Sequence, residues 1–212
     1  MLDGTKGRNP LAWISTAPAH ASNLRSLRHS FSDDEATLLM ARNCRKRNEA
    51  GESLGADCFP AQIFGAPHAK DKDYRLPDIA FAGSYWFVSK RAAEVIRQFD
   101  LGNGGLYPVE VLKKDRQTLV DGEWLCINFG NAKRTFLPQQ SSNVDPRSAG
   151  QWLPSSMMTD GNMALSTDAL AGPDLWIEPV VRDGIFFSEG LGKALKKEKV
   201  DKGFFLKRCR VL

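Results

Sequence analysis

The segment PDIAFAGSYWFVSKRAAEVIRQFDLGNGGLYPVEV, residues 77–111, contains the pattern on which the fold depends. A Pro-Asp pair leads into an apolar, aromatic run that ends at Ser89, and an amphipathic helix pattern, a glycine cluster and another apolar run follow. The C-terminal segment PDLWIEPVVRDGIFFSEGLGKALKKEKVDKGFFLKRCRVL, residues 173–212, has the same order, with Ser188 before its helix pattern. A repeated supersecondary unit of this kind predicts an architecture of paired layers.

Hydrophobic periodicity predicts three helices. Apolar residues at positions i, i+3 and i+4 from Ala92, and again from Leu191, predict one amphipathic helix behind each serine, which is a favourable N-cap. A capping-box pattern at 32–35 predicts a third helix that begins at Ser32 and runs to about Asn48. We expect the buried face of this third helix to consist of Ala36, Leu39 and Met40.

The remaining apolar runs predict strands. They lie at 81–88, 106–112, 118–120, 123–129, 174–177, 185–187 and 204–212. Asp121-Gly122 is a hairpin signal between two of them, which predicts an antiparallel meander with one face more apolar than the other. The expected fold is therefore α+β: an antiparallel sheet with packed helices and two related strand-helix-strand units.

Composition predicts how the chain is organised. We expect residues 77–212 to form the main α+β domain and residues 1–76 to pack on it as an irregular and helical region, with 1–31 irregular. A hydrophobic content of 42% and a charged content of 25% are ordinary for a globular protein. The only apolar run near the N-terminus is Leu11 to Ile14, too short for a signal peptide or a membrane span, so we expect a cytoplasmic protein.

The positive charge is concentrated at the C-terminus. Residues 190–212 contain eight Lys or Arg residues and two acidic residues, so they carry +6, while the net charge of the whole chain is +4. A basic segment can bind nucleic acid, but the same lysines can be the solvated face of one helix and the guard charges of an edge strand. Phe204 and Phe205 are adjacent, so on a strand they point to opposite faces and form no stacking platform on their own.

Residue types that catalyse reactions or bind metals are present without the required spacing. Cys44, Cys58, Cys126 and Cys209 form no C-x-x-C pair and have no histidine at ligand spacing, so we expect reduced cysteines and no metal. The candidate carboxylates are Glu94, Glu110, Glu123 and Glu178, and no spacing brings two of them together. The glycine clusters at 102–105 and 190–192 do not fit phosphate-loop spacing. These patterns favour a non-catalytic protein without a cofactor.

A long segment at 137–159, rich in Pro, Ser and Gln, is the best place for a partner contact, because loops of this length are often functional. Trp152 in it and Asp160 beside it are the candidate partner-binding residues, since Trp is enriched in binding hot spots. Trp152 can equally pin the loop to the core. We expect Trp124 and Trp176 to be core residues.

The combined motifs resemble a bacterial immunity-protein family of the polymorphic toxin systems, immunity family eleven, long catalogued as a domain of unknown function. The resemblance covers roughly residues 77–212. It depends on five stretches: DIAFAGSYWFVSKRAAEVI, LYPVEV, ALSTDALAGPDLW, GIFFSEGLGKAL and KGFFLKR. It implies a protein that binds a cognate toxin domain and neutralises it without catalytic residues. The alternative is a nucleic-acid-associated module that uses the Lys-rich C-terminus.

Overall fold

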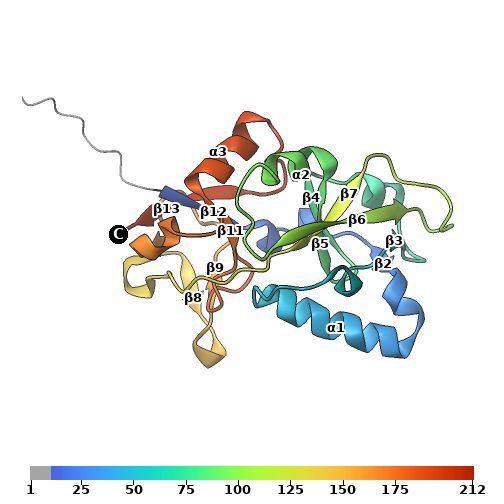
Figure 1. Cartoon of the computed structure of the whole chain (residues 1–212), viewed down its shortest axis with the longest axis horizontal. Coiled ribbons are helices and arrows are strands. Elements are labelled where there is room, and N and C mark those ends of the chain that lie inside the picture. The colour runs from blue at the N-terminus through green and yellow to red at the C-terminus, as the bar shows by residue number, and fades with distance from the viewer. Residues whose placement is uncertain (1–10) are drawn as a thin grey trace, which may run out of the picture.

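A computed structural model describes residues 11–212 and contains three α-helices and two principal sheets (Figure 1). The helices are α1 (Glu35–Glu49), α2 (Lys90–Ile96) and α3 (Glu189–Lys197). The first sheet has the order β2 (Leu27–His29), β3 (Gln62–Gly65), β6 (Gly105–Leu112), β7 (Trp124–Asn128), β5 (Tyr85–Ser89) and β4 (Ile79–Ala82). The second has the order β10 (Ala164–Leu165), β13 (Leu206–Val211), β1 (Leu11–Ser15), β12 (Ile185–Ser188) and β11 (Leu175–Trp176).

The fold is α+β, as predicted, and most strand pairs are antiparallel. The parallel pairs are β3 with β6 and β10 with β13. A separate hairpin joins β8 (Val144–Pro146) to β9 (Trp152–Pro154) within the long segment that the sequence marks as a loop. The strand expected at 118–120 is absent; it is reduced to one bridge between Leu112 and Leu119.

The first sheet is covered by a helix on each face (Figure 1). Cys44 of α1 belongs to one core with Phe87 and Cys126, while Ile96 of α2 belongs to another with Val88 and Leu125. Every residue of β7 is buried. Burial therefore does not distinguish the two faces of this strand, because packed elements cover both of them.

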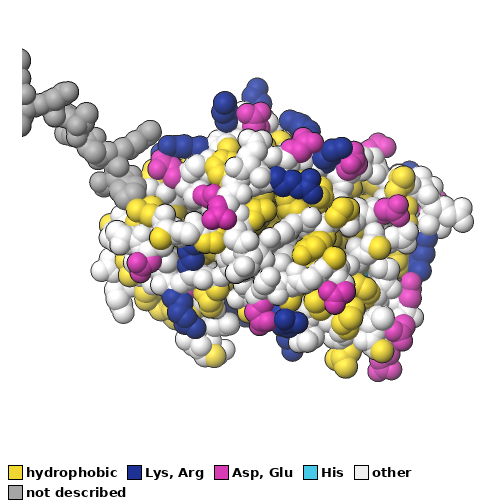
Figure 2. All heavy atoms as spheres, viewed as in Figure 1, with side chains coloured by type: hydrophobic (Ala, Val, Ile, Leu, Met, Phe, Trp, Pro, Cys, Tyr) yellow, Lys and Arg dark blue, Asp and Glu magenta, His cyan; other side chains and the backbone are white. Residues whose placement is uncertain are grey.

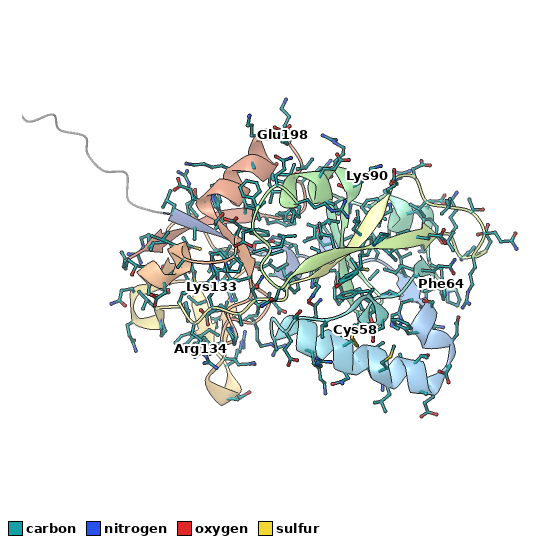
Figure 3. All side chains as sticks on the ribbon, viewed as in Figure 1. Cys58, Phe64, Lys90, Lys133, Arg134 and Glu198 are labelled. Atoms are coloured by element: carbon teal, nitrogen blue, oxygen red, sulfur yellow. A yellow bond between two sulfur atoms is a disulfide. The ribbon has the colours of Figure 1, made fainter. Side chains whose placement is uncertain are left out.

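The second sheet shares the α2 core on one face and has a core of its own on the other. Leu191 and Leu195 of α3 pack with Phe187 in the same cluster that contains α2. Phe186 and Trp176 face the opposite way, into a cluster closed by residues of the 136–181 segment. The start of α2 and the end of α3 lie close together, where Arg91 donates to the Glu198 carbonyl (Figure 3 labels Lys90 and Glu198). Trp124 and Trp176 are buried, as predicted.

The N-terminal segment contributes a central strand, which the sequence pattern did not indicate. Leu11–Ser15 pairs with β12 on one side and with β13 on the other. The expectation of irregular structure over residues 1–31 is therefore wrong for β1 and β2, and residues 1–10 lie outside the described part of the chain. The partners of β1 lie nearly the whole length of the chain away, where local periodicity cannot detect them.

Side-chain caps fix the helix starts. Ser89 accepts a hydrogen bond from Ala92 N and Ser188 accepts one from Leu191 N, each at 3.2 Å, as the sequence predicts. The N-cap of α1 is Asp34, which accepts from Thr37 N at 2.9 Å. The prediction of a Ser32 cap is wrong by two residues, because residues 30–33 form a short 3-10 turn in which Ser32 bonds to His29 O. Among residues 11–212, none of the helices combines the length and the hydropathy that a membrane-spanning helix needs.

Candidate partner-binding surface

Helix α1 presents apolar side chains to solvent. Its buried residues are Ala41, Cys44 and Asn48. Leu39 is 67% exposed and Met40 is 37% exposed, so the face predicted to be buried points outward. A helix that buries one face and still exposes adjacent large apolar side chains on the other offers a surface that a partner can cover.

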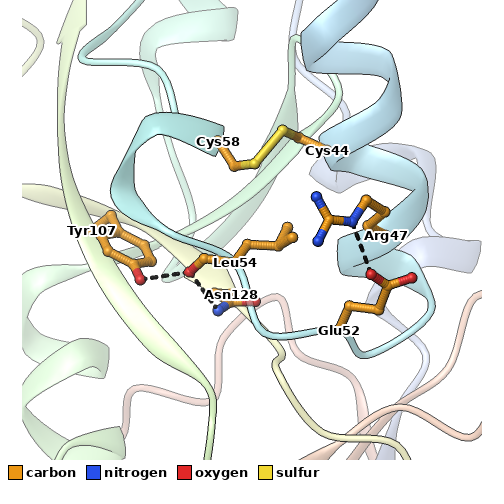
Figure 4. The surroundings of a disulfide bond; sticks show 7 residues. All are labelled: Cys44, Arg47, Glu52, Leu54, Cys58, Tyr107 and Asn128. Atoms are coloured by element: carbon orange, nitrogen blue, oxygen red, sulfur yellow. Dashed lines mark hydrogen bonds and ion pairs between the residues drawn. A yellow bond between two sulfur atoms is a disulfide. The ribbon is translucent and has the colours of Figure 1, made fainter.

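The buried face of α1 is held by polar and covalent links instead of apolar packing alone. The Asn48 side chain donates to Ile127 O and accepts from Phe129 N, both at 2.8 Å. It thus pairs with the backbone at the end of β7 as a neighbouring strand would. A disulfide joins Cys44 to Cys58 (Figure 4). The expectation of reduced cysteines is wrong for this pair, because the loop after α1 brings the two Cα atoms to 5.4 Å although they are 14 residues apart. Cys126 and Cys209 are free, as expected, and both are buried.

The loop that follows α1 is fixed to the sheet by its own carbonyl group. Tyr107 Oη donates to Leu54 O at 2.8 Å, and Asn128 Nδ2 donates to the same oxygen at 3.2 Å (Figure 4). Arg47 and Glu52 form an ion pair across the turn. These contacts make α1 a rigidly placed helix, which is the condition for a pre-organised binding surface.

The exposed face of α1 is cationic. Arg45 pairs with Glu49 at 2.7 Å. Arg42 and Lys46 have no ion-pair partner among residues 11–212. Two apolar side chains beside two uncompensated positive charges favour an acidic, partly apolar counterpart.

A cavity of about 190 Å³ continues this surface toward the second sheet. Its lining joins the C-terminal half of α1 to Gln151, in the turn between β8 and β9. Arg45 and Glu49 contribute from α1, while Arg182 and Asp183 contribute from the loop before β12. The other lining residues are Pro18, Trp86, Phe129, Gln151, Ile177, Glu178, Pro179, Val181, Gly184 and Ile185. The outer face of α1 and this cavity together form what we name the α1 surface.

Glu178 is the buried carboxyl group in the cavity wall. Its Oε2 accepts hydrogen bonds from the backbone N–H groups of Thr135 and Phe136. Burial raises the pKa of Glu178, and the bonds from Thr135 and Phe136 oppose this shift. The carboxyl group therefore ties the 135–136 segment to the loop that lines the cavity, and its bonded oxygen is not free to act on a ligand.

Trp152 and Asp160 are held by intramolecular contacts. The Trp152 ring packs edge-on against Phe136, with 5.7 Å between ring centroids, and the backbone N–H of Trp152 donates to Val180 O. Asp160 accepts from Arg208 N and Nε. Although partial burial opposes its charge, these bonds with Arg208 lower the pKa of Asp160. The structure does not bring the two side chains into one site; Gln151, the neighbour of Trp152, is the hairpin residue that reaches the cavity.

The basic C-terminal residues are dispersed and partly neutralised. Lys193 pairs with Glu189, and Arg208 pairs with Asp160. Arg210 bonds to the carbonyl groups of Gln140 and Gly161. Along the upper margin of Figure 2, over α2 and α3, Lys and Arg side chains alternate with Asp and Glu. This distribution is that of a solvated helix face more than of a continuous phosphate-binding track.

Two features bear on metal binding and catalysis: the grouping of possible ligands and the environment of Lys133. Among residues 11–212, no three His, Cys, Asp or Glu side chains are grouped so that they could hold a metal ion. Burial lowers the pKa of Lys133 to about 8, and the charges of Asp174 and Asp100 oppose this shift. The Lys133 Nζ donates hydrogen bonds to the carbonyl groups of Pro173 and Ala169. It also lies 3.9 Å from the centroid of the Trp176 ring (Figure 3 labels Lys133). These bonds hold a loop in place.

Sequence periodicity located α1 but assigned its faces incorrectly, so it missed the α1 surface. The signal that could have found it is the spacing of Ala41, Cys44 and Asn48 at i, i+3 and i+7, which places them on one face of the helix. Rules that count only large apolar residues overlook this face. Comparison with known proteins adds nothing to this geometry: the chain matches no family model and no curated protein.

Proposed function

We propose that this chain is an immunity protein: a non-catalytic protein that binds a cognate bacterial toxin domain and neutralises it in a stoichiometric complex. Two things support the proposal. The motifs between residues 77 and 212 resemble those of an immunity family, and α1 offers a rigid, exposed surface that a protein partner would fit. The observation that carries the proposal is the exposure of Leu39 and Met40 on a helix fixed by a disulfide and by Asn48.

The chemistry of the α1 surface selects the kind of toxin face that it would cover. Apolar side chains beside the unpaired Arg42 and Lys46 suit an acidic face with an apolar centre. The cavity next to them has room for about one side chain of the partner. Hot-spot residues at protein interfaces often insert into a pocket of this kind. An interface of ordinary size buries about 1,600 Å² in total. The β8–β9 hairpin with Trp152, and Asp160 beyond it, would form its edge.

The finer architecture that we propose is two related strand-helix-strand units. The pairing order β4-β5-β7-β6-β3 has the directions antiparallel, antiparallel, antiparallel and parallel, and β11-β12-β1-β13-β10 has the same series. Equivalent serines cap α2 and α3. In this comparison β1 takes the place of β7, so the N-terminal strand would complete the second unit.

The direct test is co-expression with the product of the neighbouring gene. If that product stops growth alone and this protein restores it, the double substitution Leu39→Ser with Met40→Ser should abolish the rescue, because it removes the apolar centre of the α1 surface. Leu170→Ser is the matched control, since Leu170 is 51% exposed on a different element. Growth arrest that the wild-type protein does not relieve would reject the immunity function. Rescue that survives the double substitution would reject the α1 surface instead.

A further inference from the structure

A second hollow, independent of the α1 surface, lies where the turn before β13 meets two loops of the first half of the chain. Its volume is about 450 Å³, within the range of small-molecule sites. Its lining includes Asn23, Arg25, Arg75, Asp78, Lys202 and Phe205. We name it the Phe205 groove.

The aromatic residue in this groove has an uncommon backbone conformation. Phe205 has φ of 52°, in the left-handed region that bulky residues avoid. The residue is 36% exposed, whereas Phe204 is fully buried. Gly203, at φ of 93°, begins the same turn. The turn therefore sends one phenylalanine into the core and presents the next one at the surface.

Buried side chains hold this turn at three successive carbonyl groups. Asn23 Nδ2 donates to Gly203 O at 2.8 Å, Ser15 Oγ donates to Phe204 O at 2.6 Å, and Thr16 Oγ1 donates to Phe205 O at 3.3 Å. The three donors are at most 1% exposed. Ligand sites often contain a residue in a strained backbone conformation that the surrounding hydrogen bonds hold in place.

The Phe205 ring is supported on one side by a histidine, and Phe205 remains partly exposed. His20 stacks on it with 3.6 Å between ring centroids and an interplanar angle of 14°. Phe205 lines the groove and His20 does not. The ring is thus a platform on which a second planar group can stack.

The groove is cationic. Arg25, Arg75 and Lys202 line it, and Asp78 is the acidic side chain among its lining residues. The Asp78 carboxylate accepts a hydrogen bond from Ser89 Oγ at 2.7 Å. The Arg25 guanidinium bonds to the Leu24 and Arg75 carbonyl groups, so it is positioned by the backbone.

Two cations are available to a ligand. Arg75 and Lys202 are exposed and form no ion pair among residues 11–212. A planar ring next to two unpaired cations matches a ligand that carries both an aromatic ring and a negative charge.

We infer that the Phe205 groove binds a nucleoside phosphate, with the base stacked on Phe205 and the phosphate between Arg75 and Lys202. The nucleoside phosphate can be a free nucleotide or the end of a nucleic-acid strand. An acidic protein segment would satisfy the cations but would leave the ring face without a planar partner.

The experiment is calorimetric titration of the full-length protein at low salt with AMP, adenosine, ribose 5-phosphate and a 5′-phosphorylated dinucleotide. Saturable AMP binding is expected, with adenosine and ribose 5-phosphate each at least about tenfold weaker, because each lacks one half of the recognised chemistry. Saturation by the dinucleotide but not by AMP identifies a strand end as the ligand. Ribose 5-phosphate binding as tightly as AMP would overturn the stacking role of Phe205. Failure of both AMP and the dinucleotide to saturate would overturn the proposal.

Variants locate the binding. Phe205→Gly keeps a residue that accepts positive φ and removes the ring, so it should fold and lose about 5- to 150-fold in AMP affinity. Lys202→Gln should weaken AMP binding and reduce its salt dependence. Lys197→Gln, at an exposed α3 lysine outside the groove, is the control and should bind as the wild type does. Equal losses in Lys202→Gln and Lys197→Gln would show diffuse charge attraction and would contradict the groove.

Discussion

Gly192 lets α3 approach the second sheet closely, and its replacement tests the packing of the two layers. A Cβ at position 192 would lie 2.6 Å from Trp13 Nε1 and closer still to the Cδ1 and Cγ atoms of that ring. Trp13 is 6% exposed and Lys196 lies over its ring, so the indole has little freedom to move. Glycine at this position therefore has a packing role that outweighs its poor helix propensity.

The magnitude follows from two opposing terms. Gly192→Ala gains about 1 kcal/mol of helix propensity. Overpacking a tight contact costs about 1–3 kcal/mol, and the overlap with Trp13 puts this site near about 3. We expect a net loss of about 2 kcal/mol in the free energy of unfolding, which corresponds to a melting temperature lower by about 4–8 °C for a chain of this length.

Gly190→Ala is the matched control in the same helix. A Cβ there would meet Phe99 Cε1 at 3.2 Å, a contact that a small shift relieves, so this variant should melt at or slightly above the wild-type temperature. Both variants would be compared by thermal and urea unfolding followed by circular dichroism. A Gly192→Ala protein as stable as the Gly190→Ala protein would refute the close packing of α3 on Trp13.

Three further predictions concern the first half of the chain. Reducing the Cys44–Cys58 disulfide, or substituting both cysteines by serine, should lower the free energy of unfolding by about 3 kcal/mol, and unchanged urea unfolding in reductant would contradict this. Burial lowers the pKa of His29, and the Asp33 charge opposes this shift, so on acidification His29 is protonated in the unfolded chain before it is protonated in the folded protein. The free energy of unfolding should therefore fall as the pH drops below about 6.5. The variant His29→Phe should lack this part of the pH dependence. Asp34→Ala should lower the free energy of unfolding by about 1 kcal/mol, because Asp34 is the N-cap of α1. Ser32→Ala should lower it by less, as measured by thermal unfolding. A larger loss in Ser32→Ala than in Asp34→Ala would support the predicted capping box instead.

Local signals predicted the helices well because their caps and apolar spacing are local. Ser89 and Ser188 precede short amphipathic helices, and both serines cap them through the N–H three residues later. The last strand was also predicted, at 204–212 against an observed Leu206–Val211, since a glycine turn precedes it and its tip is apolar. The pairing of that strand with β1 was not predictable, because nothing within a dozen residues of either strand specifies it.

The candidate site was missed for a related reason. Apolar periodicity assigns Leu39 and Met40 to the core, yet tertiary hydrogen bonds from Asn48 and the link from Cys44 decide which face of α1 turns inward. Those partners are 14 to about 80 residues away in sequence. Trp152 illustrates the opposite case: its alternative role of pinning the loop was foreseen, and its contact with Phe136 is of that kind.

The measurement that tests the central claim most directly is the equilibrium affinity between this protein and the purified product of the neighbouring gene. The account predicts a one-to-one complex whose dissociation constant rises at least about tenfold, or 1.4 kcal/mol, in the Leu39→Ser and Met40→Ser double variant and stays unchanged in Leu170→Ser. It also predicts weaker binding at higher salt, because Arg42 and Lys46 would face acidic groups. No detectable complex, or an affinity that the double substitution leaves unchanged, would contradict it.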